Sequence, residues 1–390
     1  MINFQDTEIA FERKSDNALK KTAWLFGMMS KPWLVSLGSK LTLFALRIGM
    51  PIQGIIKKTI FEQFCGGVSL DDSTKTVQAL ADYHVETVLD YGAEAKESEA
   101  DFENTLNEFL KVVEFAANNK SVEIISAKVT GIARFEILEK ITAGQTLNAE
   151  EQKSWDATLQ KLDSLCKTAY DKKVAIFIDA EESWIQGAID EATDLMMERY
   201  NKESVIVYNT FQLYRHDRLD FLKKSFQRAS EKSYILGAKL VRGAYMEKER
   251  VRATEKGYTS PIQPDKASTD RDYNLAVKFC VENYERIASC VASHNQKSTE
   301  YQIELMSAAG LASGHPHLSF CQLYGMSDNL TFNLAKAGFR VGKYVPFGPI
   351  KDVVPYLIRR AQENSSVNGE VGRELKMIRE EQKRRKNQKH

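Results

Sequence analysis

Short runs of β-branched and apolar residues alternate with longer segments of helical periodicity along most of this 390-residue chain. Such alternation predicts parallel strands joined by helices, because a parallel pair needs a crossover between its strands. The predicted strands cover residues 85–90, 122–129, 174–179, 204–208, 238–241, 290–293, 318–321 and 341–345. The predicted helices include residues 106–117, 184–200, 218–236, 273–288, 299–309 and 329–337, with a final helix from about Asp352. Eight such repeats fit a (β/α)8 barrel of the α/β class.

A doubly wound open sheet is the competing architecture. The chain contains no Gly-x-Gly-x-x-Gly, which open sheets commonly use to hold a dinucleotide, so we favour the barrel. Gly66 and Gly67 mark a break, and Asp71, Asp72 or Ser73 can cap the helix that follows. We expect three parts: a helical extension over residues 1–67, a catalytic barrel over 68–368 and a basic, solvated tail over 369–390.

The composition argues against several classes of protein. Lys+Arg 54 against Asp+Glu 53 leaves a formal net charge of +1, so no overall field attracts nucleic acid. The five cysteines are scattered and form no Cys-x-x-Cys pair, which indicates a reducing compartment without a disulfide framework or a zinc site. The amino terminus carries acids and lacks the basic-then-apolar pattern of a secretory leader. We therefore expect a cytoplasmic bacterial enzyme rather than a mitochondrial precursor.

Residues 32–50 are rich in apolar side chains. Ser36, Lys40 and Arg47 interrupt the stretch, which falls short of an unbroken span of a bilayer. We interpret it as a buried or docking helix. A peripheral contact with the inner face of a bacterial inner membrane is the alternative, because Lys40 and Arg47 would suit anionic head groups.

Polar side chains gather where the predicted strands end, which is where barrels of this kind hold their active sites. Strand-end Asp and Asn also cap helices, so each residue alone has a structural explanation, but together they predict a site. The residues are Asp90 after the first strand, Asp179 and Glu181 after the third, Gln212 beyond the fourth, Lys239, Arg242 and Tyr245 in and after the fifth, Ser293, His294 and Asn295 after the sixth, Gln322 after the seventh, Tyr344 in the eighth, and Arg359 with Arg360 on the last helix.

Arg359 and Arg360 are adjacent cations on a predicted helix. They repel each other unless anions lie nearby, and Glu363, at helical spacing from both, can pair with only one. A guanidinium matches a carboxylate in bidentate geometry, so the second arginine suits a small carboxylic acid. Tyr356 lies one turn earlier and can share their face of the helix. A solvated helix end is the structural alternative.

The remaining rim residues argue for an anionic cofactor and against a metal. His294 has no second histidine on its strand, so we predict no metal site. Gly243 and Ala244 would let a planar group approach the backbone closely. Arg, Lys, Gln and His side chains without a clear carboxylate pair suit an anionic cofactor rather than glycoside hydrolysis.

Seven segments, taken in order, resemble those of a known family: residues 89–92, 179–181, 239–245, 292–295, 322–326, 343–346 and 356–366. Beyond its first fifty residues the chain resembles the proline dehydrogenases, the flavin enzymes of proline catabolism. The sequence of the fifth predicted strand is similar to that of the single-function enzymes. Bifunctional bacterial relatives have an Arg where Lys239 stands, so a cation is kept. Their aldehyde dehydrogenase domain and DNA-binding arm are not expected in a chain of this length.

The resemblance implies a role for each matching residue. Asp90 and Lys239 would act in catalysis, and Asp90 and Glu363 would hold the arginines. The substrate carboxylate would be bound by Arg359, Arg360 and Lys57, with Lys58 as the alternative to Lys57. The substrate ring would be lined by Leu240, Tyr245, Tyr344 and Tyr356. FAD would be bound by Tyr91, Gln212, Lys239, Arg242, Gly243, Ala244, Ser293, His294 and Gln322.

The resemblance also implies a reaction. Hydride would pass from C5 of L-proline to N5 of FAD, giving pyrroline-5-carboxylate, and the electrons would pass on to a membrane quinone. The residues do not identify the base that takes the amine proton. One alternative is hydroxyproline dehydrogenation, which the bulk of Tyr344 disfavours. Others are a non-redox lyase or aldolase with Lys239 as its Schiff-base amine, and a catalytically silent binding module.

Overall fold

The structure is a computed structural model that describes residues 2–92, 97–366 and 370–388. The chain divides into two compact units, and each is described by itself below. The first comprises Met1–Thr87 and Gln322–His390, and the second comprises Val88–Cys321.

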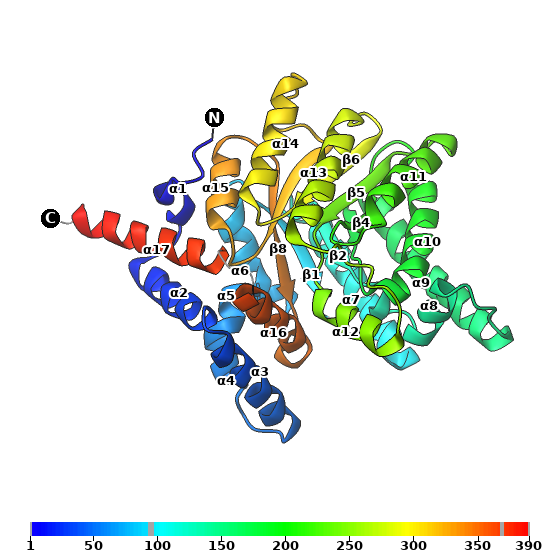
Figure 1. The fold of residues 1–390 in the computed structure, drawn as a ribbon, viewed down its shortest axis with the longest axis horizontal. Coiled ribbons are helices and arrows are strands. Elements are labelled where there is room, and N and C mark those ends of the chain that lie inside the picture. Colours follow the sequence, from blue (N-terminus) through cyan, green and yellow to red (C-terminus); the bar gives the residue numbers. More distant parts are fainter. Residues whose placement is uncertain (1, 93–96, 367–369, 389–390) are drawn as a thin grey trace. The chain divides into compact units, whose positions relative to one another are not determined.

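The strands of the described chain close into a barrel in the order β1 to β8, which confirms the (β/α)8 prediction (Figure 1). Neighbouring strands are parallel, as in the register of Ile125 with Ile176 between β2 and β3. The bounds are β1 (Glu86–Tyr91), β2 (Ile124–Ala127), β3 (Ala175–Ile178), β4 (Val207–Gln212), β5 (Leu236–Val241), β6 (Ile287–Ala292), β7 (Leu318–Leu323) and β8 (Val341–Phe347). Each predicted strand overlaps one of these.

The fourth strand shows the largest shift from its predicted position. It begins at Val207 instead of residue 204 and ends at Gln212. The reason is Asn201, whose side-chain Oδ1 accepts hydrogen bonds from the backbone N–H groups of Ile206 (3.0 Å) and Val207 (2.9 Å). This buried amide holds the preceding residues in a turn, so pairing with β3 begins only at Val207.

In the second unit, helices follow the strands and cover them (Figure 1). The bounds are α7 (Glu99–Ala117), α8 (Phe135–Thr142), α9 (Ala149–Lys172), α10 (Ser183–Tyr200), α11 (Arg218–Glu231), α12 (Met246–Lys256), α13 (Lys266–Glu282) and α14 (Gln296–Ala308), with the 3-10 turn η2 (Val129–Gly131). Two predicted helices ran too far, because Leu236 opens β5 and Ile287 opens β6. The strands of this unit are almost entirely buried, as parallel strands under helices must be, although polar side chains such as Asn209 and Lys239 lie among their apolar residues.

The first unit is largely helical outside its strands. Its helices are α1 (Thr7–Phe11), α2 (Asp16–Met29), α3 (Pro32–Arg47), α4 (Gln53–Ile56), α5 (Glu62–Phe64), α6 (Leu70–Ala81), α15 (Asp328–Lys336), α16 (Ile350–Ser366) and α17 (Glu370–Asn387), with the π-helical turn η1 (Lys57–Phe61). Ser69 caps α6 by accepting from the N–H of Asp72, one turn before the residues predicted to cap it. A core that includes Phe26, Phe64 and Leu357 joins these helices.

The carboxyl-terminal segment differs from its prediction as a solvated tail. Residues 370–387 form α17, which lies alongside α1 and α2 (Figure 1). The Arg385 guanidinium donates to the carbonyl oxygens of Phe11 (2.8 Å) and Lys14 (2.6 Å) and to Glu381 (2.6 Å). Arg385 therefore links α17 to the end of α1 and to the residues that follow it.

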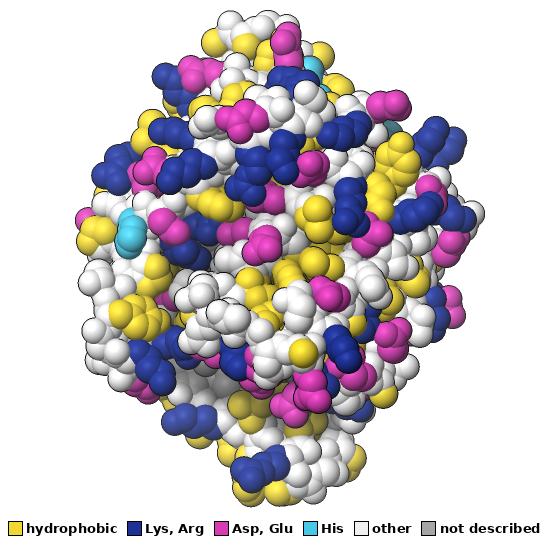
Figure 2. Space-filling model, turned by 90° about the vertical axis from the view of Figure 1, so that its right-hand side faces the viewer, with side chains coloured by type: hydrophobic (Ala, Val, Ile, Leu, Met, Phe, Trp, Pro, Cys, Tyr) yellow, Lys and Arg dark blue, Asp and Glu magenta, His cyan; other side chains and the backbone are white. Residues whose placement is uncertain are grey.

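Charge is distributed without a dominant sign. On the face drawn in Figure 2, Lys and Arg side chains are interspersed with Asp and Glu. All five cysteines lie in the interior. No helix of the described chain has the length and hydropathy that crossing a membrane would require.

Candidate active site

Two carboxylates and two lysines meet at the carboxyl ends of β1, β2, β3 and β5. Lys128 Nζ lies 3.3 Å from both oxygens of Asp90 and 3.3 Å from Asp179 Oδ2. Lys239 Nζ donates to Asp179 Oδ1 at 2.6 Å, and the hydroxyl of Ser126 donates to the same oxygen at 2.8 Å. All five side chains are buried. The structure thus brings together three of the predicted strand-end residues, Asp90, Asp179 and Lys239.

The four charges of this network depend on one another. A buried charge is costly unless it is paired, and removal of one partner of a buried pair costs about 3–5 kcal/mol. Lys239 also lies 5.1 Å from the centre of the Phe177 ring. A Schiff-base lysine would need a free amine lone pair, whereas Lys239 donates to a carboxylate. This geometry disfavours the lyase alternative.

Lys128 is the functional candidate that the sequence prediction missed. It follows β2 directly, in the same position relative to its strand that drew attention to Asp179. The sequence does show a lysine at the end of an apolar strand. A lysine in such a position is usually solvated, so the pattern alone does not indicate a functional residue. Only the fold shows that the side chain points back among carboxylates.

Arg242 organises the next part of the rim. Its guanidinium donates to Asp270 Oδ1 (2.8 Å), Ser293 Oγ (2.8 Å) and Ser298 Oγ (3.0 Å). It also stacks over the Tyr273 ring at 4.3 Å from the ring centre. These contacts fix a half-buried cation beside the loop after β6, where two of the predicted cofactor residues, Ser293 and His294, follow one another.

The loop after β6 is held by its own polar groups. Ser293 Oγ accepts the N–H of Asn295 at 3.1 Å, and Asn295 caps α14 by accepting the N–H of Ser298 at 3.2 Å. His294 lies between them and is half-buried. In the described chain, no group of three or more His, Cys, Asp or Glu side chains is placed to hold a metal ion.

Gly243 adopts a backbone conformation that favours glycine, with φ of 143°. A Cβ at this position would lie 2.4 Å from the Tyr214 ring. The planar group that approaches Gly243 in the structure is therefore the tyrosine of the neighbouring loop. Ala244 and Tyr245 follow, and Tyr245 is buried and opens α12.

Gln212 is the last residue of β4 and forms a hydrogen bond with the loop that follows β3. Its Nε2 donates to the carbonyl oxygen of Glu181 at 2.7 Å. The Glu181 carboxyl accepts from the backbone N–H (3.1 Å) and the hydroxyl (2.5 Å) of Thr130. Burial raises the pKa of Glu181 to about 8, although the bonds from Thr130 oppose this shift. Glu181 is therefore a mostly protonated carboxyl at neutral pH.

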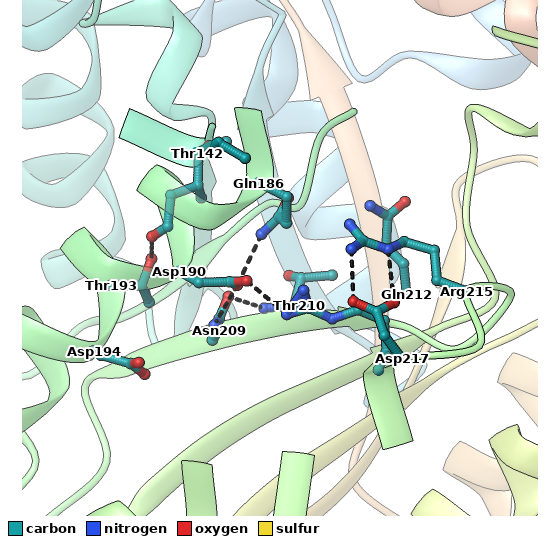
Figure 3. Close-up of polar contacts among 12 residues, drawn as sticks. Thr142, Gln186, Asp190, Thr193, Asp194, Asn209, Thr210, Gln212, Arg215 and Asp217 are labelled. Carbon is teal, nitrogen blue, oxygen red and sulfur yellow. Dashed lines mark hydrogen bonds and ion pairs between the residues drawn. The ribbon is translucent and has the colours of Figure 1, made fainter. Parts of the chain in front are cut away.

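Figure 3 shows the polar contacts that support β4 beneath Gln212. Asn209 and Gln186 each donate a side-chain N–H to Asp190 Oδ1 at 2.9 Å. Arg218 donates to the other carboxylate oxygen at 2.6 Å. Because all four side chains are buried and bonded, they fix β4 relative to α10 and α11 and leave Gln212 at a defined position.

A cavity of about 390 Å³ adjoins this part of the second unit. Its lining combines aromatic and charged side chains, and Arg252 stacks on Trp184 with 4.4 Å between the guanidinium carbon and the ring centre. Lys248 pairs with Glu182 at 2.8 Å, and both side chains belong to the lining. The lining residues are Thr130, Phe135, Glu181, Glu182, Trp184, Tyr245, Lys248, Val251, Arg252 and Glu255.

The other predicted residues of the second unit lie on β1 and β5. Tyr91 ends β1 and packs edge-on against Phe109 of α7, with ring centres 6.3 Å apart. Leu240 is fully buried in β5, and its carbonyl oxygen accepts the hydroxyl of Tyr273 at 3.0 Å.

The arginine pair lies on α16 in the first unit. Both Arg359 and Arg360 are half-buried rather than solvated. The guanidinium carbon of Arg360 lies 5.4 Å from the centre of the Tyr356 ring, so these two side chains share one face of the helix as predicted. Tyr356 is itself buried, as is Tyr344 in β8. The predicted partner Glu363 has a side chain outside the described part of the chain.

Gln322 and Lys57, also in the first unit, have different surroundings. Gln322 is buried in β7 and accepts the hydroxyl of Thr331 at 2.8 Å. Lys57 and Lys58 lie in the π-helical turn η1 and are exposed, and Lys57 Nζ lies 3.7 Å from Asp72. Their role as a third cation stays a prediction.

Comparison with known proteins identifies the family. The sequence model of the family described as "Proline dehydrogenase" matches residues 73–373, which is most of the chain. The chain belongs to the proline dehydrogenase family. This finding confirms the family and the class of enzyme that the seven segments predicted.

The relatives of this family member are themselves varied. It is 31% identical to the carbapenem antibiotics biosynthesis protein CarD of Pectobacterium carotovorum, over 89% of this chain and 90% of that one. It is 30% identical to mitochondrial proline dehydrogenase 1 of Dictyostelium discoideum, over 97% of this chain and 74% of the relative. A hydroxyproline dehydrogenase of Xenopus laevis is 29% identical, over 98% of this chain and 90% of that one.

Solved structures agree with the family at the level of the fold. Proline utilization A from Bdellovibrio bacteriovorus, inactivated by N-propargylglycine, superposes with a TM-score of 0.74 at 20% identity. The match covers 94% of this chain and 39% of that protein. This member of the family thus spans about two fifths of the solved relative.

Proposed function

We propose that this protein oxidises L-proline to pyrroline-5-carboxylate with FAD as its redox cofactor, the first step of proline catabolism. The observation that carries the proposal is the buried network of Asp90, Lys128, Asp179 and Lys239 at the strand ends of a proline dehydrogenase family barrel. Such a network fixes charge where a zwitterionic amino acid and an anionic cofactor both need it.

The substrate carboxylate is proposed to bind Arg359 and Arg360. The stacking of Arg360 on Tyr356 supports this role. Stacking orients the guanidinium through its flat face, so the N–H donors at its edge can bind a carboxylate. Tyr356, Tyr344, Tyr245 and Leu240 are buried and apolar enough to line a pyrrolidine ring. Lys57 is proposed as a further cation for the substrate carboxylate. Lys128 is an alternative candidate for this role, because it is buried beside the carboxylates of Asp90 and Asp179.

The donors of the rim fit FAD. Arg242 is a fixed guanidinium beside Ser293, and Gln212, Ser293 and His294 add further polar groups, a set that suits the pyrophosphate and ring edges of a dinucleotide. Residues proposed to hold FAD are Tyr91, Gln212, Lys239, Arg242, Gly243, Ala244, Ser293, His294 and Gln322. When bound, FAD would accept a hydride at N5 from proline C5. The chain's own contribution is orientation and electrostatic stabilisation, with Lys239 as a cation held in place by Asp179.

The electrons are proposed to pass to a membrane quinone, with the protein at the cytoplasmic face of a bacterial inner membrane. A two-electron carrier such as FAD needs an acceptor to complete the cycle. The exposed apolar side chains of α3 support contact with a membrane, because they lie on the surface of a helix that does not span it.

The visible spectrum of the purified protein tests the proposal. We expect a yellow protein whose visible flavin absorption disappears when L-proline is added without oxygen. D-proline is the matched control and should leave the spectrum unchanged. A colourless protein that binds no added FAD, or a yellow one that L-proline does not bleach, would overturn the assignment.

Hydroxyproline is the second candidate substrate, and one of the relatives is a hydroxyproline dehydrogenase. Tyr344 is buried on β8, so its phenol would occupy space that a ring hydroxyl needs. We expect a lower kcat/KM for trans-4-hydroxyproline than for proline in the same dye-reduction assay. Tyr344→Ser should narrow this difference. Equal use of both substrates by the unmodified protein would contradict the preference.

A further inference from the structure

The helices of the extension carry a surface with an unusual charge pattern. Between Asp16 and Glu62 the sequence contains no Asp or Glu. The same segment contains seven basic residues: Lys20, Lys21, Lys31, Lys40, Arg47, Lys57 and Lys58. Since the whole chain has a net charge of only +1, this concentration of positive charge is local.

The same segment holds most of the exposed apolar side chains of the described chain. Of the fifteen large hydrophobic residues that are exposed, ten lie between residues 24 and 55. We call these ten the apolar patch: Trp24, Met28, Trp33, Leu37, Leu41, Leu43, Phe44, Ile48, Met50 and Ile55.

Helix α3 gives the apolar patch its order. Trp33, Leu37, Leu41, Phe44 and Ile48 recur at intervals of three and four residues and form one stripe along the helix. Trp33 is 65% exposed and Phe44 is 59% exposed. Val35 and Ala45 are buried instead, so the helix packs on the first unit through a different face. Lys40 and Arg47 are exposed at the edge of the stripe.

We propose that the apolar patch docks this protein on an anionic lipid bilayer, with α3 lying in the plane of the interface. An in-plane helix buries an apolar stripe among the acyl chains, while Lys and Arg at its edge reach anionic head groups. The tryptophans at residues 24 and 33 suit the same depth, because their rings favour the interface. The segment's lack of carboxylates removes the groups that anionic lipids would repel.

A second copy of the chain is a poorer occupant. A symmetric dimer built on this face would bring its basic residues against their own copies. Residues 17–61 contain no carboxylate, and the nearby Glu62 and Asp72 already pair with Lys21 and Lys57, so the other basic residues of the segment would face like charge in such a dimer. An acidic protein partner is the remaining occupant, and the experiment below separates it from lipid.

The docking surface would bring the protein to a membrane acceptor, and that use of the surface rests on the proposed function. The binding itself is measured without substrate. Failure of docking and failure of proline oxidation therefore give different results.

Vesicle sedimentation of the purified holoenzyme tests the docking. The probes are vesicles of phosphatidylcholine alone and of phosphatidylcholine mixed with phosphatidylglycerol. One variant, Leu37→Glu with Phe44→Glu, removes the apolar stripe, and another, Lys40→Glu with Arg47→Glu, reverses its charge. Matched controls are Leu275→Glu on α13 and Lys224→Glu on α11, which change an exposed leucine and an exposed lysine of the second unit.

We expect the unmodified protein and both controls to sediment with the anionic vesicles and to bind phosphatidylcholine only weakly. Each double variant should bind about tenfold more weakly or worse, since each basic residue and each buried apolar side chain contributes to partitioning. Salt at about 1 M should also weaken binding. Proline-dependent reduction of a water-soluble dye should stay unchanged in every variant, which shows that each one folds.

Three results would overturn the docking. The unmodified protein could fail to bind anionic vesicles, or the double variants could bind as well as the controls. Sedimentation velocity could instead reveal a dimer that the Leu37→Glu, Phe44→Glu variant dissociates, which would make the face a contact between copies. Vesicle binding without any proline-dependent dye reduction would defeat the proposed function and leave the docking intact.

Discussion

Arg359 is the residue on which the proposed carboxylate binding depends most directly. Charge-assisted hydrogen bonds to a carboxylate are worth about 1.5–3 kcal/mol each. Every 1.36 kcal/mol is about tenfold in rate, so Arg359→Met should lower kcat/KM for proline about 10²-fold or more. Lys351→Met, on the exposed surface of the same helix, is the control and should change little. Flavin content should be unchanged in both, and an unaltered kcat/KM in Arg359→Met would remove the assignment.

Glu181 gives the stability a specific dependence on pH. Its pKa is raised to about 8 by burial, whereas an unfolded glutamate titrates near 4.5. Between these values the folded protein keeps a proton that the unfolded chain releases, so this contribution is complete at low pH and is lost as the pH rises toward 8. Glu181→Gln removes the titration, and its amide can accept the N–H of Thr130 through the oxygen and donate to the Thr130 hydroxyl through the nitrogen.

The expected outcome is a stability difference that changes with pH. Going from pH 5 to pH 7, the free energy of unfolding of Glu181→Gln should improve relative to the unmodified protein by about 2 kcal/mol. Urea unfolding at the two values measures it. Glu182→Gln is a control, because Glu182 pairs with exposed Lys248. A constant difference between the two proteins would mean that Glu181 is ionised in the folded state.

At the residue scale, sequence reasoning found positions more readily than partners. Asp90 was singled out at the end of its predicted strand and Lys239 within the fifth, their catalytic roles were implied by the family resemblance, and they do join one network. That network runs through Lys128, which no residue-type pattern distinguished from a surface lysine. A side chain's partners come from other strands, so they are fixed by barrel closure and not by neighbours in sequence.

At the scale of elements, α9 offers a local test. Asn148 accepts the N–H groups of Glu150 (3.0 Å) and Glu151 (2.9 Å), while the Glu151 side chain accepts the N–H of Asn148 (3.0 Å), which is a capping box. Asn148→Ala should lower the free energy of unfolding by about 1 kcal/mol. Urea midpoints measure the loss, with the exposed Asn17→Ala inside α2 as the control. Equal midpoints would show that the cap contributes nothing in this context.

The elements divide by how local their signals are. The eight strands could be predicted because buried parallel strands are continuous apolar runs, as in β2 and β3. Ends were displaced where a side chain decides them, as Asn201 does before β4. Helix α9 was missed although its capping box is written in the sequence. The charged segment 370–387 was taken for a tail because its partners, Phe11 and Lys14, lie at the other end of the chain.

At the scale of the whole molecule, a bound dinucleotide should stabilise the fold. A ligand that binds only the folded state adds about 2.7 kcal/mol at a free concentration 100 times its Kd. Removing the flavin should therefore lower the thermal midpoint, and adding FAD back should restore it, with FMN as a weaker substitute that lacks the adenylate half. Arg242→Met should reduce the gain from FAD, because its guanidinium is the fixed cation beside Ser293. Differential scanning calorimetry measures the midpoints without reference to activity, so a flavin-free protein that melts at the same temperature with and without FAD would contradict the proposed cofactor whatever the assay shows.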